Sequence, residues 1–202
     1  IPGGRDTGKE IIDSFYKNVK GDQKYKGCTA YADVREMFEK EKDLDAVKII
    51  TPDHLHGLLS MAAIRRGKHI LVHKPLSNRL VEGKQVIDAA RKNQKVITHL
   101  IPWDSNGSMD TVMAWINAGA IGKLTEVHNW TNRPVWPQGI PTPTGNHAIP
   151  PEVSWDLWLG TAPHREYNPA YLPATWRGWT DFGTGSLGGM GCHFIDVPYR
   201  AL

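Results

Sequence analysis

The sequence has little cysteine, no long apolar run and almost no excess of charge of one sign. Its two cysteines, Cys28 and Cys192, match no metal or redox spacing, so we expect two free, buried thiols. No apolar run approaches the roughly 18 residues that a membrane-spanning helix needs. The net charge of +3 argues against nucleic acid as the natural partner. With 202 residues, 40% of them hydrophobic, the chain can bury a core of ordinary globular composition.

Both ends of the chain are unusual. It opens with Ile1-Pro2-Gly3-Gly4, which is not a signal peptide, and it closes at Leu202 in a segment that is typical of a helix and has no stop signal. We therefore expect that segments of the whole protein are missing at both ends. The sequence leaves a cytoplasmic and a bacterial periplasmic location equally open.

Short apolar segments alternate with helical patterns over the first 120 or so residues. The pattern predicts strands at 46–51, 69–73 and 95–100, and helices at 9–20, 33–42, about 55–66, 79–92 and about 106–118. Strands that alternate with helices in this way imply right-handed crossovers and a parallel sheet. The predicted fold class is therefore α/β with a parallel sheet.

The residue composition and the hydrophobic pattern of the sequence change near residue 124. The segment 125–130 alternates like a strand with one exposed face, and a stretch rich in Pro, Trp and Gly follows from Arg133 to Pro151. Seven of the eight tryptophans lie beyond residue 110. We therefore predict one domain at 1–123 and the beginning of a second at 124–202.

Two of the predicted strands end in polar residues, at the edge where an open parallel sheet binds its ligands. The first strand leads into the segment 51–56, Thr-Pro-Asp-His-Leu-His, and the second leads into His73-Lys74-Pro75. Pro75 keeps Lys74 out of helical geometry, which would present the lysine to the crevice. The alternative is an ordinary solvated lysine in a turn, and the sequence alone leaves both open.

A glycine-rich segment, 183–196, carries a third group of candidates. Helical spacing puts Gly189, His193 and Asp196 near one face, although a histidine among apolar residues is more often structural than catalytic. Residues 183–188 also match G-x-G-x-x-G, but the segment 176–182 before them is not a buried strand. We therefore reject a dinucleotide fingerprint at this position.

Three histidines near the strand ends raise the question of a metal. His54 and His56 stand two residues apart at a predicted helix start, where side chains diverge. No cluster of carboxylates or thiolates joins them with His73. We predict no metal site.

Together these segments resemble the Gfo/Idh/MocA oxidoreductase family. The similarity covers most of residues 25–202, and the order and spacing of several independent motifs make it specific. The matching segments are Asp45 to His56, Gly67 to Leu76, Gly119 to Gly122, Trp155 to Gly160 and Gly188 to Asp196. The stretch Asn132 to Gly139 is similar to a branch of secreted or periplasmic bacterial members that act on sugars.

The resemblance implies a Rossmann domain followed by an α/β domain whose open sheet covers the active site. It implies hydride transfer between NAD or NADP and a sugar hydroxyl carbon, in a homo-oligomer. Lys74 corresponds to the family's catalytic lysine and His193 to its active-site histidine. The resemblance also implies cofactor-binding residues at Thr51, Pro52, His56, His73 and Pro75, and substrate-binding residues at Arg133, Trp136, Trp176 and Asp196.

The chain departs from the family pattern in three places. His73 stands where Glu or Gln is usual, and Gly189 stands where an aspartate usually pairs with the lysine and the histidine. The glycine-rich phosphate-binding turn belongs to a first strand that this chain lacks, so we expect weak nucleotide binding by the chain itself. These departures keep two alternatives open. One is a degenerate homologue that binds a sugar or a protein without redox chemistry, and the other is an NAD-dependent sugar lyase or hydrolase that acts through a keto intermediate.

Overall fold

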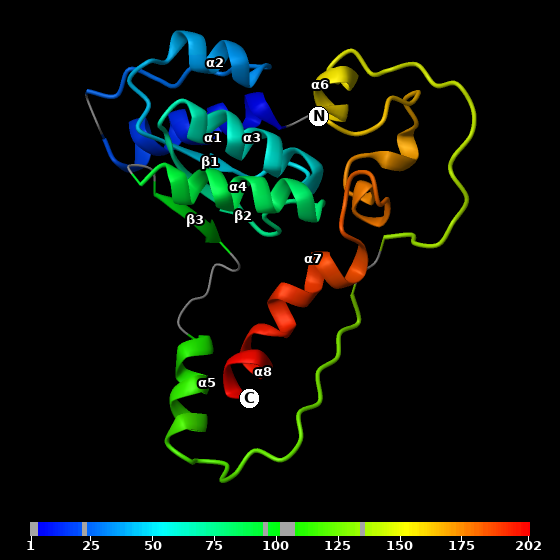
Figure 1. Ribbon diagram of the computed structural model, residues 1–202. Helices are drawn as coiled ribbons and strands as arrows, with labels where there is room; N and C mark the ends of the chain where they lie inside the picture. Colours follow the sequence, from blue (N-terminus) through cyan, green and yellow to red (C-terminus); the bar gives the residue numbers. More distant parts are fainter. Residues whose placement is uncertain (1–3, 22–23, 95–96, 102–107, 134–135) are drawn as a thin grey trace.

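A three-stranded parallel sheet organises the first half of the chain in the computed structural model, which describes residues 4–21, 24–94, 97–101, 108–133 and 136–202. The strands are β1 (Ala46–Ile49), β2 (His69–His73) and β3 (Thr98–Ile101), in the order β1-β2-β3. Helices α3 (Asp53–Arg65) and α4 (Leu80–Lys92) form the crossovers and pack side by side (Figure 1). This confirms the predicted parallel α/β sheet, although residues 95 and 96 of the third predicted strand lie outside the described residues.

The core of this half forms where α3 and α4 cover the central strand. Ile70 and Val72 of β2 and Val86 of α4 are fully buried, and Phe38 of α2 (Val34–Lys40) packs into the same cluster. Helix α2 begins where Asp33 accepts a hydrogen bond from the backbone N–H of Arg35, at 2.8 Å. Before it, α1 (Arg5–Ser14) continues into a π-helical turn over Phe15–Val19.

A second core in the later half of the chain is almost entirely aromatic. Phe182, fully buried, lies against the rings of Trp155, Trp158 and Tyr171 at centroid distances of 4.6 to 6.5 Å. The two tryptophans come from α6 (Trp155–Leu159), and the tyrosine ends a 3-10 turn, Pro169–Tyr171. Aromatic pairs in such edge-on and offset arrangements stabilise a core beyond the area they bury, which explains why tryptophan concentrates in this half.

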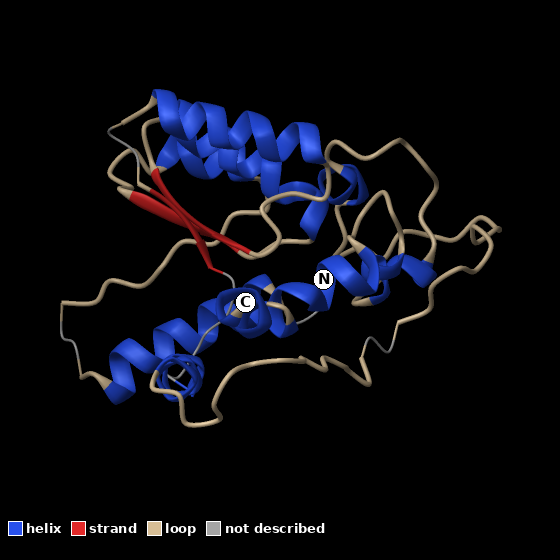
Figure 2. Cartoon of the chain, turned by 60° about the horizontal axis from the view of Figure 1, so that its bottom comes forward, coloured by secondary structure: helices blue, strands red, loops and turns tan. Residues whose placement is uncertain are grey.

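The remaining helices are α5 (Ser108–Asn117), a 3-10 turn at Thr175–Gly178, α7 (Gly185–Phe194) and α8 (Asp196–Ala201). Figure 2 shows helices on both sides of the sheet. No described helix is long and apolar enough to cross a membrane. Both cysteines are free, as predicted, but each is half-buried rather than fully buried.

The structure corrects two predictions about the second half. The segment 125–130 is not a strand: it is irregular, and Trp130 in it is 81% exposed. A strand needs a hydrogen-bonding neighbour, and no described strand lies beside this segment. The predicted helix through Gly189, His193 and Asp196 is also broken, at Ile195. Pro198 has no N–H to donate to the carbonyl of Phe194, which accepts instead from the amide of Asn129 at 2.6 Å.

His54, the second residue of α3, joins the two cores. Its ring is 1% exposed and lies 2.6 Å (Nε2) from the carbonyl oxygen of Trp158 and 3.3 Å (Nδ1) from that of Phe182. Its backbone N–H also donates to Phe182, at 3.2 Å. Burial lowers the pKa of His54 and outweighs the two carbonyls, which raise it. The ring is therefore neutral in the folded protein near neutral pH and donates from one nitrogen only.

This lowered pKa makes stability depend on pH. Protonation favours the unfolded chain, so the stability contributed by the neutral ring is fully present above about pH 6.5 and is lost as pH falls through the folded pKa. We expect the melting temperature to decrease on acidification below about pH 6.5, and we expect His54→Gln to flatten that part of the curve. Scanning calorimetry of both proteins at matched pH measures the difference. Parallel curves would contradict the prediction.

Candidate active site

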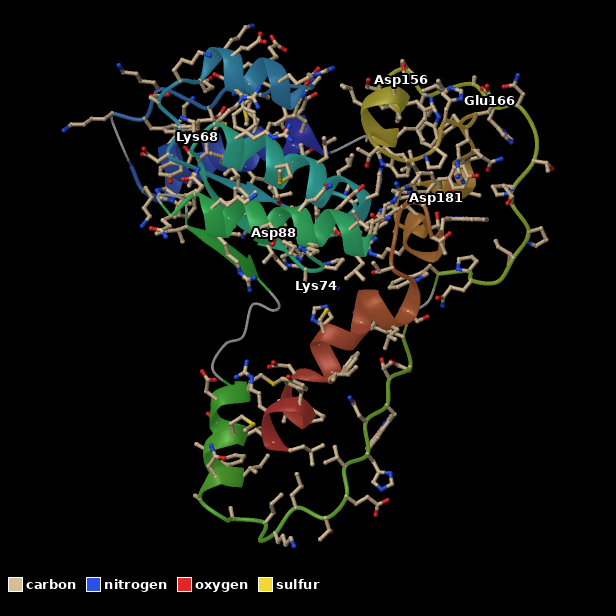
Figure 3. All side chains as sticks on the ribbon, viewed as in Figure 1. Lys68, Lys74, Asp88, Asp156, Glu166 and Asp181 are labelled. Atoms are coloured by element: carbon tan, nitrogen blue, oxygen red, sulfur yellow. The ribbon has the colours of Figure 1, made fainter. Side chains whose placement is uncertain are left out.

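The carboxyl ends of β1 and β2 bring Thr51 and Lys74 to the same edge of the sheet. The register pairs Ile49 with Val72, and two further residues along each strand lead to Thr51 and Lys74. The peptide bond between Lys74 and Pro75 is cis. Figure 3 shows Lys74 at the edge of the sheet domain that faces α7.

The ring of His56 bridges the segments that follow β1 and β2. Its Nδ1 lies 2.6 Å from the carbonyl oxygen of Pro75 and its Nε2 lies 2.8 Å from that of Thr51. A ring that spans the two chain segments fixes the distance between them, and therefore the position of the lysine. With both ring nitrogens of His54 and of His56 directed at backbone carbonyls, neither ring is available to a shared metal ion.

Helix α7 completes the site from the far part of the sequence. The Nζ atom of Lys74 donates a hydrogen bond to the carbonyl oxygen of Gly189, and His193 follows one helical turn later. Lys74, Gly189 and His193 border one cavity of about 670 Å³. The structure thus gathers the predicted lysine and histidine around one space, although they stand more than 100 positions apart in the chain.

The environment of His193 reflects the charges around this cavity. Burial is the largest cause that lowers its pKa, and the positive charges of Lys74, His73 and Arg133 lower it further, to about 4. His193 is therefore neutral at physiological pH. A neutral imidazole can accept a proton or a hydrogen bond from a substrate hydroxyl.

Asp53 supplies a carboxylate to the cavity. It lies in the first turn of α3, is 7% exposed and accepts a hydrogen bond from the hydroxyl of Thr184 at 2.9 Å. Burial raises the pKa of Asp53, while Thr184, His56 and Lys74 oppose the rise. Among the described lining residues it is the only acid, so it balances only part of the positive charge.

Nine of the eleven predicted site residues border the cavity. Pro75 and Asp196 do not: Pro75 turns its carbonyl to His56, and Asp196 pairs with Arg200 at 2.8 Å. The residues that do are Thr51, Pro52, His56, His73, Lys74, Arg133, Trp136, Trp176 and His193.

Sequence reasoning missed three polar residues of the cavity, which are Asp53, Arg177 and Thr184. Asp53 could have been found, because it stands within the polar segment that ends the first strand. Arg177 and Thr184 carry no such signal, since only the tertiary fold brings the 3-10 turn and the start of α7 to the strand ends.

The strand ends also offer space for a dinucleotide. A second cavity, of about 410 Å³, shares Thr51 and Pro52 with the first and extends to Arg5 and Asp6 of α1. The hydroxyl of Thr51 is buried and has no hydrogen-bond partner in the described part of the chain. A buried hydroxyl without a hydrogen-bond partner costs free energy, unless a bound ligand supplies the partner. Thr51 and Pro52 therefore fit a nicotinamide cofactor that crosses the strand ends.

Comparison with known proteins places the chain in a family. Residues 9–100 match the NAD-binding Rossmann model of the Gfo/Idh/MocA oxidoreductase family, and residues 109–200 match its C-terminal alpha/beta domain. The chain belongs to this oxidoreductase family.

Its curated relatives include sugar-converting enzymes. It is 33% identical over 164 residues to levoglucosan dehydrogenase of Pseudarthrobacter phenanthrenivorans. The aligned region covers 78% of this chain and 33% of the relative. It is 32% identical over 91 residues to 1,5-anhydro-D-fructose reductase of Ensifer adhaerens, covering 44% of this chain and 27% of the relative. The chain thus spans about a third or less of the length of these relatives.

Solved structures of the family align over part of the chain. A levoglucosan dehydrogenase in complex with NADH and levoglucosan is 26% identical, with a TM-score of 0.42, over 60% of this chain and 30% of that one. An inositol dehydrogenase homolog from Azotobacter vinelandii, complexed with NADH and myo-inositol, is also 26% identical, with a TM-score of 0.42, over 46% of this chain and 26% of that one.

Proposed function

We propose that the protein containing this chain is a dehydrogenase that transfers a hydride between a nicotinamide cofactor and a carbon bearing a sugar hydroxyl. The observation that carries this proposal is the meeting of Lys74 and His193 at one cavity beyond the strand ends. Trp136 also borders the cavity, and its indole Nε1 is a buried donor without a hydrogen-bond partner in the described residues. A polyhydroxylated substrate would supply an acceptor to this donor.

Each side chain has a role in this reaction. A nicotinamide held at Thr51 and Pro52 would supply the acceptor for the hydride, with its electron pair, that leaves the carbinol carbon. Lys74, in its neutral form, takes the hydroxyl proton as the carbonyl forms. His193, neutral in the folded protein, accepts a hydrogen bond from the same or the neighbouring hydroxyl and orients it. Asp53 interacts electrostatically with Lys74, whose charge lowers the pKa of Asp53 against the larger, opposite effect of burial.

Reduction of the cofactor tests the proposal. The full-length protein is incubated with NAD⁺ or NADP⁺ and a panel of neutral and acidic sugars, and the absorbance of the reduced nicotinamide is followed. We expect reduction with at least one sugar and a marked preference for one cofactor. Sugar binding without any reduction would favour a binding protein, and a released product at the oxidation level of the substrate would favour lyase or hydrolase chemistry.

We further propose that the protein is a homo-oligomer. Tyr199 of α8 is 81% exposed, and Ile195 and Leu202 on either side of this helix are 46% and 87% exposed, which supports a further contact surface. Sedimentation of the full-length protein determines its mass in solution.

A further inference from the structure

The cavity that holds Lys74 carries more positive charge than hydride transfer alone requires. Among its described lining residues, Arg133 and Arg177 are permanent cations, Lys74 becomes a cation when it takes the proton of the substrate, and Asp53 is the one carboxylate. None of these three basic side chains forms an ion pair with a carboxylate of the described residues. Cations that share a partly enclosed cavity repel one another, so an anionic ligand would stabilise the site.

Arg177 is the cation that is best positioned to bind such a ligand. Its guanidinium carbon lies 4.3 Å from the ring centroid of Trp176 and 5.8 Å from that of Trp136. The backbone at Arg177 is also fixed, because a Cβ on Gly183 would lie 2.6 Å from its carbonyl oxygen. The guanidinium is therefore held in place by stacking and close packing.

Most of the hydrogen-bonding capacity of Arg177 remains for a ligand. A guanidinium has five N–H donors, and the described structure gives Arg177 one side-chain hydrogen bond, to the carbonyl oxygen of Ala174 at 3.2 Å. A planar fork of N–H groups matches a carboxylate or a phosphate in bidentate geometry. Arg177 and Arg133 border the cavity of Lys74 and His193 and do not border the second cavity beside α1.

We infer that the sugar substrate is an anion, a sugar that carries a carboxylate or a phosphate, and that Arg177 binds its charged group. The inference rests on the proposed function for the identity of the ligand as a sugar. Arg177 is thus a specificity-determining residue, because it selects the charged sugar over its neutral counterpart. Arg133, exposed at the mouth of the cavity, adds long-range attraction.

Equilibrium binding tests this inference without requiring turnover. The full-length protein, saturated with NADH so that the alcohol cannot react, is titrated calorimetrically with matched sugars. The pairs are glucuronate with glucose and galacturonate with galactose, and glucose 6-phosphate is the phosphate arm. We expect at least one charged sugar to bind about 10- to 100-fold more tightly than its neutral partner, the typical contribution of a charge-assisted hydrogen bond. Tighter binding of a uronate identifies the charged group as a carboxylate, and tighter binding of glucose 6-phosphate identifies it as a phosphate.

Three variants assign the preference to its residue. Arg177→Gln should reduce the ratio of charged to neutral affinity to within about twofold, whereas Arg177→Lys, which keeps the charge without the fork, should retain part of it. Arg91→Gln removes the same charge from the exposed face of α4 and should leave the ratio unchanged. Melting temperatures of all variants verify folding.

The outcomes separate this inference from the proposed function. A charged preference that disappears in Arg177→Gln supports the inference, even where no sugar reduces NAD⁺. Equal or tighter binding of neutral sugars, or no binding of any charged sugar, overturns it while leaving dehydrogenation of neutral sugars possible. A ratio of charged to neutral sugar affinity that is unchanged in Arg177→Gln also overturns the inference. If that variant loses NADH affinity while the ratio stays the same, the charge of Arg177 binds the cofactor and not the sugar.

Discussion

Replacing Lys74 with alanine should lower kcat by on the order of 10²- to 10⁴-fold, the usual contribution of a positioned acid–base group. The variant loses the amine that takes the hydroxyl proton, and its hydrogen bond to the carbonyl of Gly189. Sugar affinity should change much less, because Trp136 and Arg177 still border the cavity. Steady-state rates and calorimetric titration of the same preparation separate the two effects.

Lys68→Ala is the matched control for this variant. Lys68 stands just before β2 and Lys74 just after it, so the two lysines lie at opposite ends of the same strand (Figure 3). Lys68 donates to the backbone carbonyl of Lys42 at 3.1 Å and does not border the cavity. The control should keep kcat within about threefold of the parent. Similar losses in both variants would mean that Lys74 acts through stability and not through chemistry.

Gly189→Asp should raise turnover, by about 10- to 1000-fold, if the protein is a dehydrogenase whose orienting carboxylate is absent. The new carboxylate would lie in the turn of α7 that already contacts Lys74, one turn before His193. The site has limited room, since a Cβ at this position comes 3.3 Å from the Cζ2 atom of Trp136. The indole must therefore shift by a few tenths of an ångström.

Gly189→Ala controls for the added Cβ. It places the same Cβ near Trp136 and gains about 1 kcal/mol of helix propensity, more than aspartate gains. Rates are compared per folded molecule at saturating sugar, because an added negative charge also weakens the binding of an anionic substrate. A rise specific to Gly189→Asp that vanishes when Lys74→Ala is added supports the damaged dehydrogenase. No rise, with sugar binding intact, favours the non-catalytic binder.

The sequence predicted the sheet well because strand and helix periods are local properties. The segments 46–49 and 69–73 are apolar and β-branched, and their polar ends point to a site at Thr51 and Lys74 whatever the rest of the chain does. The strand predicted at 125–130 was wrong because alternation is necessary for a strand but not sufficient. A strand also needs a neighbouring strand with which to form hydrogen bonds, and no described strand lies beside this segment.

The position of Arg177 in the cavity was beyond local reasoning. Arg177 comes from a 3-10 turn whose sequence is that of any tryptophan-rich loop, and its position depends on packing against Trp176 and Gly183. The break at Ile195 could have been predicted, since Pro198 cannot donate the hydrogen bond that a continuous helix needs. Asp196 was assigned to the face of His193 only because that break was overlooked.

The hydrogen bond between Lys74 and Gly189 joins residues 115 positions apart. Bringing them together closes a long loop, which costs conformational entropy. The contacts that offset this cost can form only after β2 and α7 have each formed. Contacts of such high sequence separation are slow to form compared with the crossovers of the sheet. We therefore expect the cavity of Lys74 to be among the last parts of the molecule to assemble. During synthesis Lys74 emerges with its strand well before the helix that completes the cavity has been made.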